Sequence, residues 1–226
     1  MRSSVALARG LRVAAAVHMG SRRAVRHTAR VPQIRIAQDA AADELLGRDP
    51  LALVLGMLLD QQFAMERAFA APRLLADRLG GVDVLSAADL AERDTEQLVK
   101  AFQGPPALHR YPGSMAARTQ AVCRLLVERY GGRADGLWAD VPDGSTLLKR
   151  IVELPGFGEQ KAKIFVALLG KQYRVTPPGW REAAGDYGLE GSRRSVADVT
   201  GSESLAEVRQ FKQEQKAAAK KGAGAG

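Results

Sequence analysis

The hydrophobic positions of the chain recur at intervals of three and four residues, the spacing of helices that bury one face. The densest stretch, Leu51 to Leu59, follows Asp49-Pro50, a capping carboxylate and a proline suited to the first helical position. Because this stretch is apolar nearly all round, we expect it to lie at the centre of the core. No segment sustains the alternation of a strand, so the pattern predicts an all-α protein.

Further helices are indicated by periodicity and by capping residues. Ser86 and Asp94 can each cap a short helix, since both side chains accept hydrogen bonds from main-chain N–H groups. We expect the helix at 65–79 to be interrupted at Pro72, which cannot donate a main-chain bond. The expected helices are at 40–46, 51–59, 65–79, after Ser86, after Asp94, at 115–130, on both sides of 154–158, and after Ser202.

The sequence Leu-Pro-Gly-Phe-Gly at residues 154–158 lies between two of these helices. Proline and glycine prevent the helices from merging, so we expect a short hairpin there. The second helix would begin with free N–H groups beside glycines, an arrangement that favours an anion. Residues 145–181 hold seven basic and two acidic residues, which indicates a clamp for a phosphate backbone. An ordinary helical corner with a solvated basic face is the alternative.

Two motifs in this region carry a resemblance to a known family. Leu-Pro-Gly-Phe-Gly followed by Lys161-Ala162 resembles the hairpin of the helix-hairpin-helix DNA glycosylase superfamily, the enzymes of base excision repair. The segment Leu58-Leu59-Asp60-Gln61-Gln62 is similar to that family's Leu-Leu-Ser-x-Gln segment. The resemblance covers roughly residues 49 to 180. It implies a glycosylase-like helical bundle with double-stranded DNA as the partner.

The resemblance also implies a set of DNA-binding residues. Gln62 is the candidate to fill the space left when a base is extruded from the duplex, because a side chain in that gap reduces the cost of unstacking. Without the resemblance, residues 60–62 would be interpreted as a solvated helix end. His109, Arg110, Tyr111 and Arg118 are candidates to contact the DNA backbone, but a solvated loop is the preferred interpretation of these residues. The implied DNA-binding residues are Gln61, Gln62, Pro155, Gly156, Phe157, Gly158, Gln160, Lys161, Lys163 and Arg174.

The chain departs from the family at the catalytic carboxylate. A carboxylate stabilises the oxocarbenium-like sugar formed when a glycosidic bond breaks. The family carries an aspartate about twenty residues after the hairpin, but if Val175 takes the preceding position, Thr176 stands in its place. Three explanations remain open. Asp60 or Asp186 is a displaced catalytic carboxylate, the protein recognises lesions without excising a base, or the chemistry proceeds slowly through binding and positioning alone.

A second departure concerns the Schiff-base lysine of the bifunctional members. That position holds Gln160, and Lys161 lies one residue later, where we expect it to face elsewhere on the helix. Lyase chemistry is therefore not expected. The resemblance implies a monofunctional DNA N-glycosylase that removes a damaged or mismatched base. The alternatives are a catalytically degenerate protein that binds DNA damage or unusual DNA structure, and a helical protein-interaction module.

The cysteine and histidine content limits the possible cofactors. Cys123 is the only cysteine, which excludes a disulfide framework, a zinc site built on several cysteines and a four-cysteine iron–sulfur cluster within the chain. Its apolar neighbours predict a buried thiol. Only three histidines are present, and two of them, His18 and His27, lie in the N-terminal arm. We expect no metal site and no cofactor.

The net charge of +8 is concentrated at the two ends. Residues 1–32 contribute +7 and residues 212–226 contribute +3, so the body carries −2. We expect a disordered basic segment at 1–33, a helical domain at 34–211 and a disordered basic tail at 212–226. The arginine-rich start is compatible with an organelle transit peptide, a DNA-holding arm or an upstream start codon. We expect no membrane span, a monomer, and a cytoplasmic, nucleoid-associated location if the source is bacterial.

Overall fold

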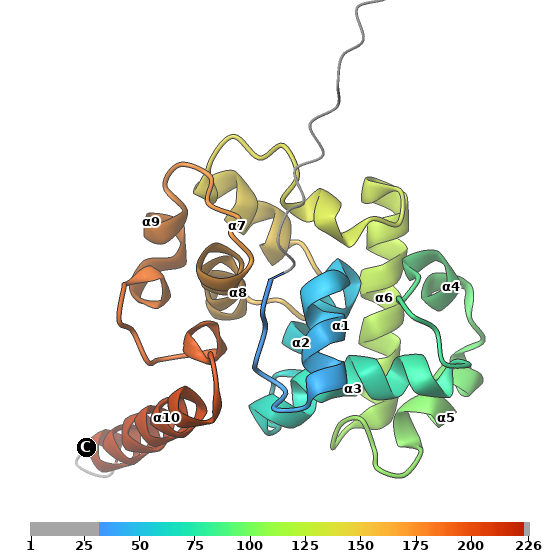
Figure 1. Cartoon of the computed structure of the whole chain (residues 1–226), viewed down its shortest axis with the longest axis horizontal. Helices are drawn as coiled ribbons and strands as arrows, with labels where there is room; N and C mark the ends of the chain where they lie inside the picture. The colour runs from blue at the N-terminus through green and yellow to red at the C-terminus, as the bar shows by residue number, and fades with distance from the viewer. Residues whose placement is uncertain (1–31, 224–226) are drawn as a thin grey trace, which may run out of the picture. The chain divides into compact units, whose positions relative to one another are not determined.

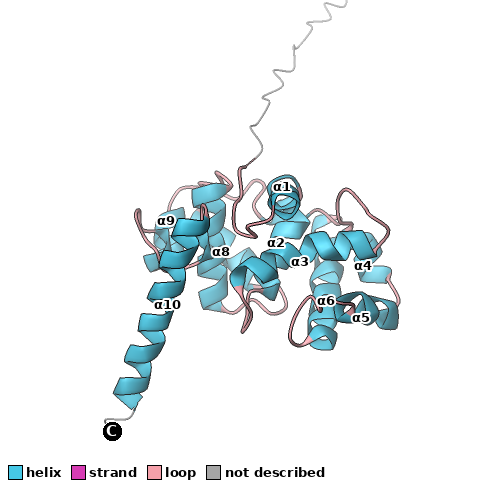
Figure 2. Cartoon of the chain, turned by 60° about the horizontal axis from the view of Figure 1, so that its bottom comes forward, coloured by secondary structure: helices cyan, strands magenta, loops and turns pink. Residues whose placement is uncertain are grey.

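The computed structural model describes residues 32–223, and these residues are helical with no strand among them (Figures 1 and 2). They all belong to one compact unit that begins at Val31. The expected N-terminal segment, apart from its last two residues, lies outside the described residues, as do residues 224–226 of the expected tail. Within residues 32–223, no helix is both long and apolar enough to cross a membrane.

The order of elements follows the expected pattern closely. The α-helices are α1 (Ala40–Arg48), α2 (Pro50–Leu59), α3 (Met65–Arg78), α4 (Ala87–Glu92), α5 (Thr95–Gln103), α6 (Pro112–Tyr130), α7 (Gly144–Val152), α8 (Glu159–Gln172), α9 (Trp180–Ala184) and α10 (Ser202–Ala223). Three short 3₁₀ turns, η1 (Ala134–Leu137), η2 (Gly185–Gly188) and η3 (Val196–Asp198), connect them.

Helix α2 is the centre of the core, as its composition predicts. Every residue from Leu51 to Leu59 is buried, and α2 packs against α1, α3, α6 and η1. Its start is fixed by Asp49, whose side chain accepts hydrogen bonds from the main-chain N–H groups of Leu51 at 2.9 Å and Leu85 at 2.7 Å. Asp49 therefore caps α2 and also attaches the loop before α4 to it.

Helices α3 and α6 differ from the expectation. Helix α3 continues through Pro72 without interruption. Pro72 is buried on the packed face, and tertiary packing retains the helix despite the missing main-chain donor. Helix α6 begins at Pro112, three residues before the expected start, because proline is well suited to the first helical turn.

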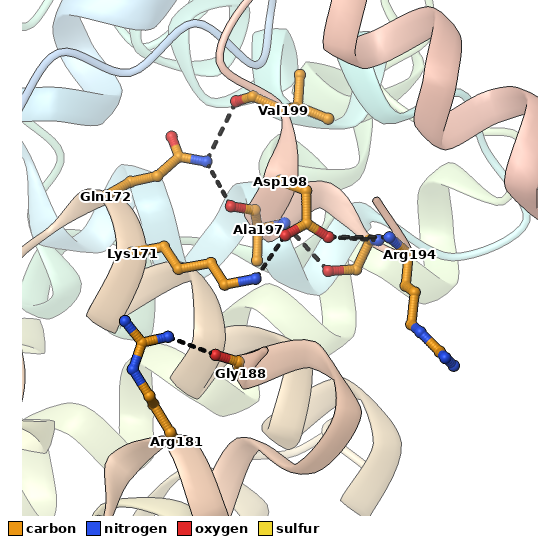
Figure 3. Close-up of polar contacts among 9 residues, drawn as sticks. Lys171, Gln172, Arg181, Gly188, Arg194, Ala197, Asp198 and Val199 are labelled. Carbon is orange, nitrogen blue, oxygen red and sulfur yellow. Dashed lines mark hydrogen bonds and ion pairs between the residues drawn. The ribbon is translucent and has the colours of Figure 1, made fainter. Parts of the chain in front are cut away.

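The end of α8 holds the connection that leads to α10 (Figure 3). The Lys171 ammonium group forms an ion pair with Asp198 at 2.6 Å, and the Gln172 amide donates to the carbonyl oxygens of Ala197 at 2.9 Å and Val199 at 3.1 Å. Since both partners of the ion pair are largely buried, η3 is fixed on α8. This attachment sets where α10 begins.

Helix α10 corrects the expectation of a disordered tail from residue 212. The chain is helical as far as Ala223, so the expected domain end at residue 211 falls inside a helix. Residues 212–221 are rich in Ala, Lys, Gln and Glu, which have high helix propensity. A hydrogen bond of 2.9 Å from Gln210 to Glu214 supports the helix at this boundary.

Candidate functional site

The hairpin between α7 and α8 is attached to the core by two apolar side chains. Leu154 and Phe157 are buried, with 2 % and 4 % of their surface exposed, and the Phe157 ring packs against Phe165 with 5.9 Å between centroids. Gly156 has a φ of +87°, which L side chains rarely adopt. Of the predicted DNA-binding residues, the Phe157 side chain therefore faces the core, and the exposed part of the hairpin is Gly156 and Gly158.

The first turn of α8 has unsatisfied main-chain donors. The first N–H group that bonds back along the chain is that of Ala162, which donates to the Gly158 carbonyl at 2.9 Å. The amides of Glu159, Gln160 and Lys161 have no acceptor among residues 32–223. The space around Gly158 is open, with no atom within 4 Å of an added Cβ. Free amides at the positive end of a helix dipole form a site for an anion.

The basic residues around the hairpin are mostly engaged in structural contacts. Lys163 pairs with Glu159 at 2.6 Å, and Lys171 pairs with Asp198. The Arg150 guanidinium donates to main-chain carbonyls at 3.0 to 3.5 Å, and Arg181 donates to the Gly188 carbonyl at 2.6 Å. Arg174 is exposed and has no hydrogen-bond partner among the described residues. The excess of basic residues in the sequence is therefore a weaker argument for phosphate binding than the free amides.

The turn after α2 holds the two glutamines in different states. Gln61 is fixed, since its amide nitrogen donates to the Leu58 carbonyl at 2.8 Å and its amide oxygen accepts from Arg118 at 2.8 Å. Gln62 is exposed and has a φ of +50°, an uncommon conformation for a residue other than glycine. Backbone strain of this kind is found at functional sites, where the surrounding structure maintains it.

His109 maintains this turn. The interpretation of its loop as solvated holds for Arg110, Tyr111 and Arg118, which are exposed, but not for His109. The ring is buried, with 1 % exposed. Its Nδ1 accepts a hydrogen bond from the Tyr111 N–H at 3.1 Å, so Nε2 carries the proton and donates to the Gln61 carbonyl at 2.9 Å. Burial lowers the pKa of His109 and favours this neutral form. A lone histidine without a motif gave no signal in the sequence for this role.

An open pocket of about 930 Å³ lies beside this turn. It is lined by residues from the end of α2, the following turn, the loop before α6, the first half of α8 and the middle of α10. Its apolar lining includes Met57, Phe63, Met65 and Ile164. Its polar and charged lining consists of Asp60, Gln62, Arg110, Gln160, Lys161, Arg209, Lys212, Gln213 and Lys216.

Lys161 lines this pocket together with Gln160, but as expected the two side chains face different directions. The Gln160 amide donates to Tyr187, whereas Lys161 reaches the end of α2. Its ammonium group donates to the carbonyl oxygens of Met57 at 3.0 Å and Leu58 at 2.8 Å. The last carbonyls of a helix lack partners within the helix, so a lysine from α8 is drawn to the end of α2. Burial lowers the pKa of Lys161 to about 8, against the opposing effect of Asp60.

Asp60 follows the last residue of α2 and also lines the pocket. Its carboxyl group has no hydrogen-bond partner among the described residues. Burial raises the pKa of Asp60, while the positive charges of Lys212 and Lys161 act in the opposite direction. A carboxyl group with a raised pKa, next to a lysine with a lowered one, is an arrangement found more often at functional sites than on ordinary surfaces.

Asp186, the other carboxylate considered from the sequence, lies outside this pocket. It is on η2, and its side chain is 69 % exposed and pairs with Arg194 at 3.0 Å. Its neighbour Tyr187 accepts a hydrogen bond from Gln160 at 2.9 Å. Of the two candidate carboxylates, Asp60 is the one that shares the pocket with Gln62 and Lys161.

The arrangement combines three chemical capacities. The first turn of α8 can bind an anion, Gln62 projects from a strained turn, and the pocket brings a carboxyl group and an amine together beside apolar side chains. Comparisons of the chain with protein-family models, with curated proteins and with solved structures find no significant match. The interpretation of the site consequently rests on its own geometry.

Proposed function

We propose that this protein binds double-stranded DNA through the hairpin and acts as a monofunctional DNA N-glycosylase in base excision repair, with a helix-hairpin-helix glycosylase-like fold. One observation supports the proposal above the others. Gln160 and Lys161, two of the three residues with free amides, line one pocket together with the strained Gln62 and Asp60.

DNA binding in this proposal begins at the first turn of α8. The amides of Glu159, Gln160 and Lys161 donate hydrogen bonds to a phosphate oxygen, and Gly158 allows the backbone to approach it. Arg118 lies beside the hairpin, since its Cδ is 3.5 Å from the position of an added Cβ at Gly156. Its exposed guanidinium adds a positive charge at this surface. Binding of this type weakens steeply as the salt concentration rises.

Base extrusion is the next step. Gln62 enters the stack at the position left by the base, because it is exposed and held outward by the turn that His109 supports. The extruded nucleotide enters the pocket, where Met57, Phe63 and Ile164 offer apolar surface for the base. The pocket volume of about 930 Å³ accommodates a nucleotide.

Asp60 then stabilises the sugar as the glycosidic bond breaks, in the manner of the carboxylates of glycoside hydrolases. The ionised form performs this role. The positive charges of Lys161 and Lys212 favour ionisation and oppose the effect of burial. Lys161 remains bonded to the carbonyls of α2, which is consistent with hydrolysis without a covalent lysine intermediate.

A catalytically degenerate DNA-damage-binding protein with the same site is the second candidate. The raised pKa of Asp60 favours it, because burial works against the ionised carboxylate that would stabilise the positive charge. Thr176, at the position where the resembled family carries its aspartate, is exposed and supplies no carboxylate. This candidate binds DNA with the hairpin, Gln62 and the pocket, but it does not cleave the glycosidic bond.

A base-release assay with the full chain separates the two candidates. The substrates are duplexes with uracil, alkylated purines, 8-oxoguanine or mismatches, and alkali is added afterwards to reveal abasic sites. Asp60→Asn should abolish release while DNA binding persists, and Asp186→Asn, the matched control on the exposed surface, should retain it. Strand cleavage without alkali would contradict the monofunctional assignment.

The binding arm of the experiment uses Gly158→Val, which adds bulk beside the free amides in open space. This variant should fold and lose salt-dependent DNA binding. Binding of damaged duplexes without base release from any of them would support the degenerate binder. DNA binding that is unchanged in Gly158→Val would contradict both candidates.

A further inference from the structure

The pocket has a wall to which the proposed function gives one role, the positive charge of Lys212 near Asp60. Arg209, Lys212, Gln213 and Lys216 of α10 all line it, at the i, i+3, i+4 and i+7 spacing of one helix face. We call these four residues the basic face of α10. We propose, as an extension that rests on the proposed function, that this face binds the phosphate of a nucleotide that remains part of a DNA strand while its base occupies the pocket.

The contacts of the three cations differ, and the difference supports a ligand. Arg209 pairs with Glu66 of α3 and attaches α10 to the body of the protein. The Lys212 ammonium group contacts the sulfur of Met65 at 3.3 Å, and a thioether is only a weak acceptor. Lys216 is exposed and has no polar partner among the described residues. Two ammonium groups are therefore held at the pocket without an anion within ion-pair distance.

The charge balance of the pocket favours an anionic ligand. Five basic side chains line it, and Asp60 is the one acidic residue among the lining residues. The apolar side chains of Met57 and Ile164 lie in the same lining. A ligand with a flat apolar ring and a phosphate matches both parts.

The location of the basic face indicates that the ligand of the pocket is a nucleotide within a DNA strand and not a free nucleotide. Gln160 and Lys161, whose main-chain amides are free, line the pocket from α8, and Lys212 and Lys216 line it from α10. Two phosphate-binding groups on separate walls of one pocket match the two phosphates that flank an extruded nucleotide. A mononucleotide has one phosphate and would leave one of these groups unoccupied.

The test compares two double variants of the full chain, each lacking two positive charges. Lys212→Ala with Lys216→Ala removes the free cations of α10. Arg35→Ala with Lys100→Ala is the matched control, since both residues are exposed and outside the pocket lining. Equilibrium binding is measured on a duplex with one abasic-site analogue, over a series of salt concentrations. Thermal unfolding monitors the fold of every variant.

We expect the α10 variant to bind more weakly and its log–log salt slope to decrease by about two, roughly one per lost phosphate contact. The control variant should retain the wild-type slope. Lys212→Arg with Lys216→Arg should restore the slope, because charge is retained. An excess of a deoxynucleoside monophosphate should displace the duplex poorly.

Two results would overturn the inference and leave the proposed function intact. The first is a wild-type salt slope in the α10 variant. The second is displacement of the duplex by the monophosphate at concentrations comparable to those of the strand, which would assign the pocket to a free nucleotide. If the wild-type protein shows no salt-dependent binding of DNA, the proposed function fails and the inference fails with it.

Discussion

Lys161 and Leu58 join the hairpin to the centre of the core: the ammonium group of Lys161 donates to the Leu58 carbonyl oxygen over 2.8 Å. The bond places a positive charge at the negative end of the α2 dipole. It also places the hairpin helix beside Asp60, two residues after Leu58. One contact thus fixes the position of the candidate anion site relative to the pocket.

The lowered pKa of Lys161 predicts a specific dependence of stability on pH. The pKa is about 8 in the folded protein and near 10.5 in the unfolded chain, so the unfolded state binds more protons between these values. Stability contributed by this group therefore rises as the pH increases from about 8 to 10.5, by at most about 3 kcal/mol. Chemical denaturation of the wild type and Lys161→Met across this range measures the difference.

Comparison with Lys161→Met removes the contribution of other groups that titrate in alkali. The variant itself leaves the Met57 and Leu58 carbonyls without their donor, which costs about 1–3 kcal/mol. At neutral pH it also removes a buried positive charge, which offsets part of that cost. The unfolding free energy of the wild type minus that of the variant should increase toward pH 10.5, because only the wild type gains stability from the titration of Lys161. A difference that stays constant with pH would show that Lys161 titrates normally.

Asp60→Asn should stabilise the protein at neutral pH. Burial raises the pKa of the Asp60 carboxyl group, so the folded state binds more protons than the unfolded chain above the ordinary pKa of 3.8. The sign of this linkage makes stability fall as the pH increases through the folded pKa. A neutral amide removes that loss, and the unfolding free energy at pH 7 should increase.

The control for Asp60→Asn is its behaviour in acid. Below pH 3.8 the carboxyl group is protonated in both states, so the advantage of the variant should disappear there. Asp186→Asn, whose side chain is exposed and ion-paired, should change stability little at either pH. Lower stability of Asp60→Asn at pH 7 would mean that the charges of Lys161 and Lys212 stabilise the ionised carboxylate more than burial destabilises it.

Local chemistry made the starts of three helices, α2, α4 and α5, predictable from the sequence. The side chains of Asp49, Ser86 and Asp94 accept hydrogen bonds from amides two or three residues ahead, so the signal and the structure lie within one turn. The burial of α2 followed from its composition alone. Pro72 was misjudged because packing on other helices outweighs a local preference.

The site was less predictable because its contacts join distant residues. The Lys161 contact with Leu58 spans 103 positions, and the His109 contact with Gln61 spans 48. The hydrophobic periodicity of a sequence does not indicate which distant main-chain carbonyl a lysine side chain will bond. The basic face of α10 belonged to a segment interpreted as a disordered tail, although its composition favours a helix. The resemblance drew attention to Asp60 and Gln62, but nothing in the sequence indicated that α10 lines the same pocket.

The two hairpin glycines should respond differently to substitution by alanine. Gly156 has a φ of +87°, and an added Cβ would lie 2.9 Å from Cδ1 of Leu58, so Gly156→Ala should destabilise the protein by about 1–3 kcal/mol. Gly158 has a φ of −79° and open space around it, so Gly158→Ala should change stability little. Urea denaturation of the two variants is the measurement, and equal losses would contradict the observed hairpin geometry.

Cys123 should be unreactive in the native protein. It is fully buried, and burial raises the pKa of its thiol to about 12, so the reactive thiolate is nearly absent at neutral pH. Iodoacetamide should alkylate it only in denaturant, as mass spectrometry of the intact protein would show. Rapid alkylation without denaturant would mean that α6 opens readily around Cys123.

Because Cys123 is protected, a cysteine introduced on the surface becomes a selective probe of α10. Gln213→Cys places a thiol on the basic face, and Gln103→Cys places one at the exposed end of α5 as a control. DNA with an abasic-site analogue should slow alkylation of the first thiol several-fold and leave the second unaffected. The reason is steric, since a strand held by Lys212 and Lys216 covers residue 213. Equal rates with and without DNA at both positions would place the strand away from α10, even if the hairpin binds it.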